Sequence, residues 1–273
     1  DKNGSNAGCA RVFERNGSGW IQIGSDILGL AAYDQLMQVA LSGDGNTLAV
    51  SMPRNDDNGV NTGKVQIFSF VQEEWTKLGN NDIMTGSNGE LFGQYGLTIS
   101  TDGMTVAAGS IWENYVKVYT LVDGGWSLLG NVINGQSGDM YGLSVDLSDN
   151  GRRLIVGFSF NNNESGRAVV FDYDNDNEGG NWVTVGQSLY GDNSNDRFGG
   201  SVSISGSGNR IAVGGYERDN RTGHVRVFDL SFDGDVNTWN QVDEDIDGQL
   251  AGEYFGVSVA LSNDAKFVAI GGP

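Results

Sequence analysis

Four acidic residues recur at one position relative to an aromatic residue, and such a set could bind a cation or transfer protons. Each stands two residues before a Phe or a Tyr; the four are Glu90, Asp139, Asp196 and Glu253. If these segments lead into the innermost strands of a repeating β fold, the carboxylates form a partial ring at the mouth of a central channel. Like charges gathered there repel, so a ring either binds cations or has raised pKa values. The alternative is that each carboxylate accepts backbone N–H bonds where two units meet.

A second candidate site is centred on Trp112, which has no counterpart in the other repeating units described below. It lies beside Glu113, Asn114 and Tyr115, in a loop that is much shorter than the equivalent loops. An unrepeated tryptophan next to polar side chains is typical of a platform for sugar stacking or protein docking. The alternative is that Trp112 folds over and fills the space left by the shortened loop.

His224 and Cys9 are each the only residue of their kind, which draws attention to nucleophilic chemistry. Both occupy the same place in a repeated phrase, in "GHVRVF" and "GCARVF", where other units carry Lys64, Tyr115 and Arg167. A position that accepts such different side chains is expected to be the start of a strand. With a single cysteine there is also no internal disulfide, and we expect no catalytic nucleophile.

The elements that must position these residues are short strands in a repeat. Alternating apolar runs with a turn rich in Asp, Asn and Gly predict β-hairpins at 37–50, 96–109, 142–157, 200–215 and 256–272. Third strands are predicted at 63–68, 114–119, 166–171 and 223–228. Fourth strands, each opened by a tryptophan, are predicted at 75–79, 126–130, 182–186 and 239–243. The aromatic residues shared by the units are expected to be core residues that pack between units.

The fifth hairpin has no third and fourth strand after it, but the segments 8–13 and 20–24 have the matching phrases. The unit tryptophans recur about every 55 residues, and the step from Trp239 through the C-terminus to Trp20 has the same length. We therefore predict an all-β fold: a five-bladed β-propeller with four antiparallel strands per blade, one blade closed by strands from both termini. Residues 1–273 are expected to form this single domain as a piece of a larger protein. A linear β-solenoid is the alternative.

The phrase "YFGVSVALSNDAKFVAIGGP" resembles an FG-GAP repeat, the blade unit of integrin α-subunit propellers and of many surface proteins. Phe255 and Gly256 match the FG, and weaker copies stand at 92–93, 141–142 and 198–199. The resemblance implies a propeller in a surface protein. It would also imply a calcium cage in the first hairpin turn, but these turns carry one or two carboxylates at most, too few for the six to eight oxygens that calcium prefers. A divalent cation such as Ca²⁺ therefore stays only an open alternative.

Composition narrows the class of function. The formal net charge of −19 disfavours nucleic acid as a partner. No apolar run approaches the roughly 18 residues of a membrane span, so we expect no membrane insertion. The chain is interpreted as a monomeric, non-catalytic binding or adhesion module of a secreted or cell-surface protein, with a glycan or protein ligand. Two alternatives remain: an enzyme resembling glycoside hydrolases that uses the channel-mouth acids, and a purely structural spacer.

Overall fold

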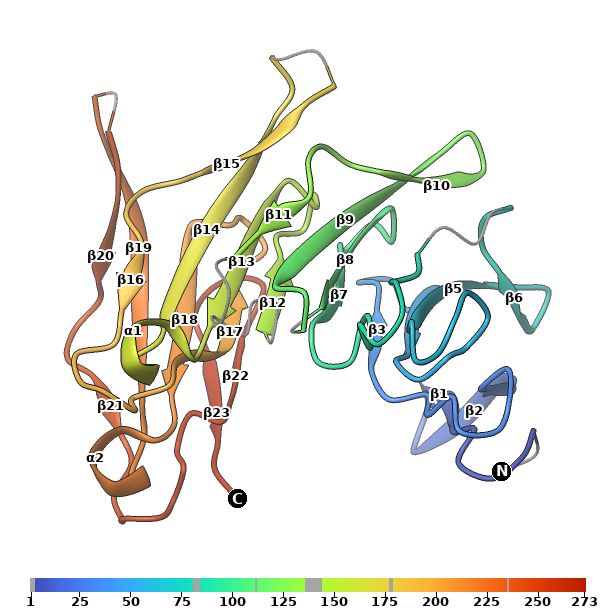
Figure 1. Ribbon diagram of the computed structural model, residues 1–273, viewed down its shortest axis with the longest axis horizontal. Helices are drawn as coiled ribbons and strands as arrows, with labels where there is room; N and C mark the ends of the chain where they lie inside the picture. The colour runs from blue at the N-terminus through green and yellow to red at the C-terminus, as the bar shows by residue number, and fades with distance from the viewer. Residues whose placement is uncertain (1–2, 81–83, 111, 136–143, 177–178, 235) are drawn as a thin grey trace.

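The computed structural model describes residues 3–80, 84–110, 112–135, 144–176, 179–234 and 236–273 (Figure 1). All paired strands of the described chain are antiparallel, which confirms the all-β prediction. Two four-residue turns, labelled α1 (Asn161–Glu164) and α2 (Arg218–Arg221), interrupt the chain, and both contain residues with positive φ. Neither these nor any other described segment forms a helix long and apolar enough to cross a membrane.

Four consecutive units each form a sheet of four strands in chain order, called blades 1 to 4 here. Blade 1 contains β3 (Val39–Leu41), β4 (Thr47–Met52), β5 (Lys64–Val71) and β6 (Glu74–Lys77). Blade 2 contains β7 (Leu97–Ile99), β8 (Thr105–Ser110), β9 (Tyr115–Val122) and β10 (Gly125–Leu128). Blade 3 contains β12 (Ser144–Leu147), β13 (Arg153–Phe158), β14 (Arg167–Asp174) and β15 (Asn181–Thr184). Blade 4 contains β17 (Phe198–Ile204), β18 (Arg210–Gly215), β19 (His224–Asp233) and β20 (Val236–Gln241).

Short additional strands pair with the first residues of the third strands of blades 2, 3 and 4. They are β11 (Ile133–Asn134), β16 (Leu189–Tyr190) and β21 (Ile246–Asp247). Each lies in the connection that leads from one blade to the next. These connections therefore run along the same end of the sheets as the loops between second and third strands, and together they form the loop face of the molecule (Figure 1).

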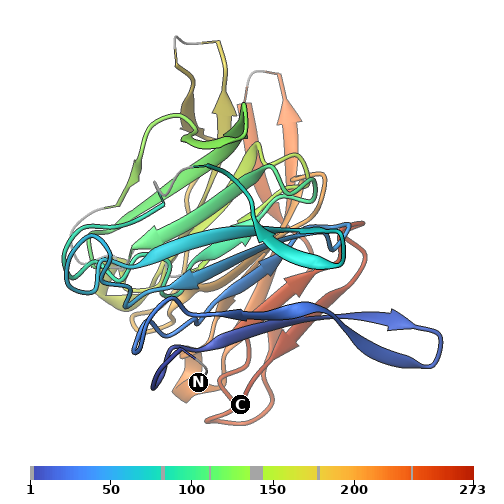
Figure 2. The same cartoon turned by 90° about the vertical axis from the view of Figure 1, so that its right-hand side faces the viewer.

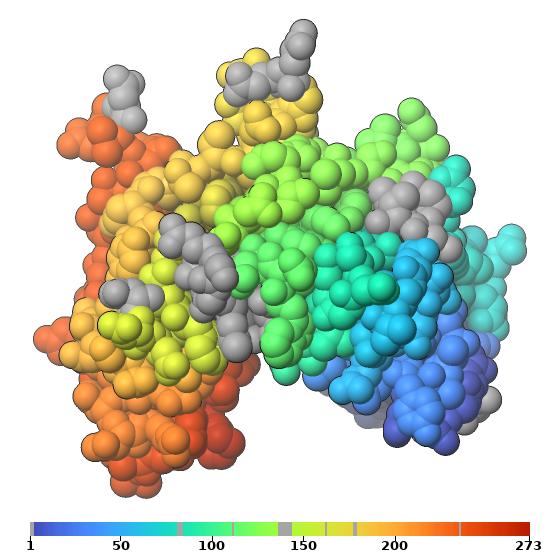
Figure 3. All heavy atoms as spheres, viewed as in Figure 1, coloured from blue at the N-terminus to red at the C-terminus, as the bar shows by residue number. Residues whose placement is uncertain are grey.

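The prediction that the two terminal strand pairs join into one blade is not met in this structure. Within the described ranges, β1 (Cys9–Asn16) pairs only with β2 (Gly19–Leu28), and β22 (Ser258–Leu261) pairs only with β23 (Val268–Gly271). We call these pairs the N-terminal and C-terminal half-blades. Figure 2 shows the first as a separate two-stranded ribbon in blue, and Figure 3 shows a notch in the surface between the blue and the red ends of the arc. The reason is the curvature of the four complete blades, which leaves the two half-blades apart.

The core lies between neighbouring blades. The second strands β4, β8, β13 and β18 are buried along almost their whole length. They read as continuous apolar runs because both of their faces are covered. The largest continuous clusters combine side chains of adjacent blades, for example Val170 and Leu189 of blade 3 with Phe228 and Trp239 of blade 4. Burial of such side chains stabilises the fold by roughly 1.5–3 kcal/mol each.

Each unit tryptophan of blades 1 to 4 also ties its blade to the preceding one. The indole Nε1 donates to a backbone carbonyl of the previous outer strand, and the acceptor always stands three residues after that strand's own tryptophan. The four bonds run from Trp75 to Ile23 (3.0 Å), from Trp126 to Leu78 (2.9 Å), from Trp182 to Leu129 (2.8 Å) and from Trp239 to Val185 (2.9 Å). Their burial confirms that Trp126, Trp182 and Trp239 are core residues, whereas Trp75 is partly buried and Trp20, expected in the core, is 71% exposed.

A backbone ladder links the hairpin turns between first and second strands. Each turn donates an N–H to the carbonyl of the equivalent residue in the next unit. The bonds run from Gly43 to Thr101 (2.9 Å), Thr101 to Asp149 (3.1 Å), Asp149 to Gly206 (3.0 Å) and Gly206 to Asn263 (3.0 Å). Five units are therefore arranged in one continuous curve, which positions their loops side by side.

Candidate functional site

The predicted channel-mouth acids do not form an open ring. Asp196 is 1% exposed, and its Oδ2 accepts the backbone N–H of Asn193 at 2.8 Å. Glu253 Oε2 accepts the backbone N–H groups of Gln249 and Leu250 at 2.6 and 3.0 Å. Both carboxylates thus close their own turns, which is the structural alternative raised from the sequence. Asp139 lies outside the described residues.

Sequence analysis missed the equivalent acid of blade 1. Asp34 is 2% exposed, and its Oδ2 accepts the N–H of Ala31 at 2.9 Å and the side-chain amide of Asn55 at 3.1 Å. Asp34 stands two residues before Leu36. The N–H of Leu36 donates to a carbonyl in the loop of the preceding unit, and the N–H of Phe92 in blade 2 does the same. The spacing is the same as in the other units, but the aliphatic Leu36 replaces the aromatic residue that marks this position elsewhere.

Glu90 differs from the other acids because the structure brings it to Tyr115, a residue predicted for the second site. The Tyr115 hydroxyl donates to Glu90 Oε2 at 2.5 Å, and both side chains are buried. Lys117 Nζ lies 3.3 Å from the same hydroxyl and 4.5 Å from the centre of the Tyr115 ring. The two predicted sets of residues therefore meet in one cluster between Phe92 and the loop of Trp112.

The charges in this cluster are set by burial and by Glu90. Burial, followed by the hydrogen bond to Glu90, raises the pKa of Tyr115 well above its ordinary value. Burial lowers the pKa of Lys117, and the nearby carboxylate of Glu90 opposes this effect. At neutral pH the phenol is protonated and donates its hydrogen bond to Glu90. Glu90 is thus held in place by its neighbours.

Trp112 points into solvent, with 59% of its surface exposed. Its loop joins β8 to β9 and is fixed at both ends. Ser110 Oγ donates to the backbone carbonyl of Glu90 at 3.0 Å, and the carbonyl of Asn114 accepts the N–H of Gly135 at 2.7 Å. Glu113 is exposed and Asn114 is half-buried. The interpretation that Trp112 fills the space of the shortened loop is therefore wrong; the short loop presents the indole outward.

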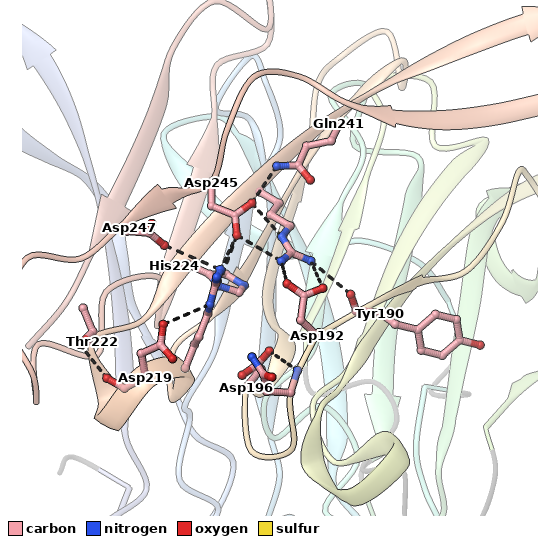
Figure 4. Close-up of polar contacts among 12 residues, drawn as sticks. Tyr190, Asp192, Asp196, Asp219, Thr222, His224, Gln241, Asp245 and Asp247 are labelled. Carbon is pink, nitrogen blue, oxygen red and sulfur yellow. Dashed lines mark hydrogen bonds and ion pairs between the residues drawn. The ribbon is translucent and has the colours of Figure 1, made fainter.

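A polar network that sequence analysis missed lies on the loop face of blade 4 (Figure 4). Arg226 on β19 donates through Nε to Asp245 at 2.9 Å and forms a close ion pair with Asp192. Arg218 of α2 forms a close ion pair with Asp245, and its Nη1 lies 2.5 Å from His224 Nδ1. The network joins two inter-blade connections to α2 and β19.

Charge compensation within this network is strong. His224 is fully buried, and burial followed by the positive charges of Arg218 and Arg226 lowers the pKa of its imidazole to about 4. The neutral ring accepts a hydrogen bond from Arg218 through Nδ1. Burial alone would raise the pKa of Asp245, but hydrogen bonds from Arg226 and Arg218 hold it well below its usual value. The arrangement stabilises loops and leaves neither of its two arginines without a carboxylate partner.

Three residues of this region could be read as metal ligands, since atoms of His224, Asp245 and Asp247 lie within 4.8 Å of one another. They do not fit a divalent cation. The guanidinium of Arg218 is directed at His224 Nδ1 and at Asp245, so a positive charge already occupies the space that a metal would need. A metal ligand set requires free lone pairs on histidine and carboxylate.

A further carboxylate lies on the concave side, where the first strands meet. Asp146 on β12 accepts hydrogen bonds from Ser203 Oγ at 3.0 Å and from the Ile204 N–H at 2.9 Å, both in blade 4. The Thr98 hydroxyl of blade 2 donates to it at 3.2 Å. Burial raises the pKa of Asp146, and these hydrogen bonds oppose the rise. The carboxylate links three blades near the axis of the arc.

Comparison with known proteins gives the fold and no family. No family model matches the chain, and no curated protein matches its sequence. The periplasmic gluconolactonase PpgL of Pseudomonas aeruginosa is similar in structure, with a TM-score of 0.64 and 15% identity over 95% of this chain and 70% of that one. A protein from Lactobacillus plantarum has a TM-score of 0.61 and 14% identity, over 95% and 70%.

The β-propeller domain of Swd1 from Myceliophthora thermophila has a TM-score of 0.51 and 12% identity, over 98% of this chain and 88% of that domain. With two further structures, from Bacteroides fragilis and Desulfotomaculum acetoxidans, the chain spans only 57% and 64% of the other protein. At these identities the likeness concerns the fold alone. The four-stranded sheets and these similarities together show that the chain has a β-propeller fold.

Proposed function

We propose that this protein is a non-catalytic binding module of a secreted or cell-surface protein, which takes a glycan on its loop face at Trp112. The FG-GAP resemblance seen in the sequence agrees with such a role. A protein ligand at the same place is the second class of partner. The proposal rests on one observation above the others, the outward presentation of a tryptophan that has no structural task in the blades.

The contrast with the other tryptophans supports this proposal. Trp126, Trp182 and Trp239 are between 2% and 5% exposed and donate across blade junctions, whereas Trp112 is 59% exposed on a loop tied down at both ends. A rigid aromatic face costs little entropy when a ligand stacks on it. The neighbouring Glu113 and Asn114 can supply hydrogen bonds to hydroxyl groups of a sugar.

The state of the described carboxylates also supports a binding role. Asp196 and Glu253 accept backbone N–H groups of their own turns, and Glu90 accepts the Tyr115 hydroxyl. A glycosidase needs two carboxylates with separated pKa values that both reach the substrate. Each of these three acids is held by hydrogen bonds within the scaffold, Asp196 and Glu253 by backbone N–H groups and Glu90 by a tyrosine hydroxyl.

The test is a glycan array with the wild-type chain and two variants, run with calcium and with a chelator. Trp112→Ala is expected to abolish binding. Val60→Ala is the matched control, because Val60 is 67% exposed on the neighbouring loop of blade 1. We expect binding by wild type and control, without a need for calcium. Equal binding by Trp112→Ala would contradict the site, and the absence of any glycan ligand would contradict the ligand class.

A second candidate is hydrolysis of a sugar lactone. It is favoured by the structural similarity to a gluconolactonase and by Asp146, a carboxylate of raised pKa on the concave side. The assay is consumption of gluconolactone by the wild type and by Asp146→Asn. The binding proposal predicts no turnover above the rate in buffer, whereas turnover that is lost in the variant would support the lactonase.

A further inference from the structure

We propose that the two open edges of the arc are docking surfaces for about two further units of this same repeat, which complete the ring. The occupant is defined by its chemistry. At the C-terminal edge it supplies a third strand with an aromatic residue and a fourth strand with a tryptophan. At the N-terminal edge it supplies a backbone carbonyl three residues after its own tryptophan.

At the C-terminal edge, the residues that pack against the next blade elsewhere in the molecule have no blade to pack against. In blade 3 the side chains of Val185 and Leu189 are 4% and 6% exposed, because Trp239 of the next blade packs over them. Their counterparts in blade 4 are Val242 and Ile246. These line a hollow of about 200 Å³ with Phe267, and Ile246 is 38% exposed. By the repeated pattern, the carbonyl of Val242 is the acceptor for the next unit's indole.

The N-terminal edge shows the other half of the same junction. Trp20 is 71% exposed and Phe13 is 49% exposed, whereas the equivalent Trp126 and Tyr119 of blade 2 are 2% and 4% exposed. The hairpin turns between first and second strands show the same difference between the N-terminal edge and the inner blades. A side chain from the preceding blade packs against Gly103, Gly151 and Gly208, but among the described residues nothing lies within 4 Å of a Cβ built on the equivalent Gly45.

The number of units needed to complete the ring is derived from the share of similar propellers that the chain covers. The five units, aligned over 95% of the chain, cover 70% of the gluconolactonase PpgL. In a closed ring of similar units, that share corresponds to about seven units, and the 88% of the Swd1 propeller domain that the chain covers corresponds to about six, both within the four to eight blades that propellers have. A unit of this repeat buries its faces only against neighbours, so both edges gain stability from the added units. A ring of five closed by the chain's own ends, and a second copy of the chain, are the rival occupants.

Register in the complete blades gives a test with one new cysteine. The last residue of each second strand pairs with the first of the third: Met52 with Lys64, Ser110 with Tyr115, Phe158 with Arg167 and Gly215 with His224. By the same register Gly272 would face Cys9, which is exposed and is the only natural cysteine. We expect Gly272→Cys to stay reduced under mild oxidation. An intramolecular disulfide would overturn the proposal in favour of a five-unit ring, and a disulfide-linked dimer in favour of self-association.

The control for this test is the pair Met52→Cys and Lys64→Cys in a Cys9→Ser background. These positions are opposed in blade 1, so the pair is expected to form a disulfide under the same conditions. It shows that the oxidation reaches a true strand pair.

A second test adds a copy of residues 54–159 after Pro273. The copy begins at the point of the repeat where the chain ends, so it adds two units in register. We expect the extended chain to unfold in one transition at a higher temperature, and modification of Cys9 by a thiol reagent to slow by roughly tenfold or more. The matched control carries the Trp75→Ala change in the added copy only, and there the protection of Cys9 is expected to be lost. Unchanged reactivity of Cys9 in the extended chain would overturn the proposal.

Discussion

Acid should destabilise this protein through His224, and the effect can be separated from general acid unfolding. The imidazole is fully buried and faces Arg218, Arg226, Asp245 and Asp192. Burial and the two arginines lower the pKa of His224 from about 6.5 in an unfolded chain to about 4 in the folded one. Between these values the unfolded state binds a proton that the folded state does not bind.

The sign and size of the effect follow from linkage. Since the unfolded state binds more protons between about pH 6.5 and pH 4, the free energy of unfolding falls as the pH falls through this window. The whole shift corresponds to about 3 kcal/mol, of which about 2 kcal/mol is lost between pH 6.5 and pH 4.5. The depressed pKa of Asp245 acts at lower pH, because its contribution is present above an unfolded value of 3.8 and is lost below it.

The perturbation is His224→Gln, which removes the titrating group and keeps an oxygen that can accept from Arg218. We expect this variant to be less stable than wild type at pH 6.5, because a buried aromatic ring is lost. Its free energy of unfolding should nevertheless fall by about 2 kcal/mol less than that of wild type between pH 6.5 and pH 4.5.

The assay is urea unfolding followed by tryptophan emission at pH 6.5, 5.5 and 4.5. Extrapolated free energies are compared as differences between pH values within each protein, so that the packing loss cancels. If the variant and the wild type lose the same free energy over this range, His224 does not titrate with a depressed pKa and the reasoning is refuted.

Two further predictions concern blade junctions and cations. Trp239→Ala should lower the free energy of unfolding by roughly 3–5 kcal/mol, because Trp239 is 2% exposed and donates to Val185. Trp20→Ala, at 71% exposure, should change it by less than about 0.5 kcal/mol; urea midpoints check both, and equal effects would contradict the junction. A chelator should leave Tm unchanged, because Arg218 occupies the candidate metal position; a fall in Tm in calorimetry would show a bound cation.

The architecture was largely predictable because each repeating unit has a recognisable local sequence pattern. Alternating apolar residues and Gly-rich turns place the strands, and the spacing of Trp75, Trp126, Trp182 and Trp239 sets the units. The angle between blades is a different matter. It depends on how side chains of two sheets fill their shared space, as Val185 and Leu189 do beneath Trp239. No local pattern encodes this angle, so the joining of the terminal half-blades was predicted and is not found.

The candidate site was predictable only in part, because its contacts cross between segments. Trp112 was found by its lack of a counterpart, and its exposure agrees with that reasoning. The bond between Tyr115 and Glu90 joins residues 25 positions apart, one at the start of β9 and the other in the connection before β7. The network around His224 was not predicted, because the residue type at this strand position differs in every unit. The partners of His224 lie in connections that share no sequence pattern.

The most direct test of the proposed function is the affinity of the wild-type chain and of Trp112→Ala for one glycan selected on the array, measured side by side by calorimetric titration. Circular dichroism and Tm should show both proteins equally folded, since an exposed loop residue is replaced. We expect the variant to lose more than about 2 kcal/mol of binding free energy, as for a central aromatic contact. Equal affinity of the two proteins would contradict the proposed function.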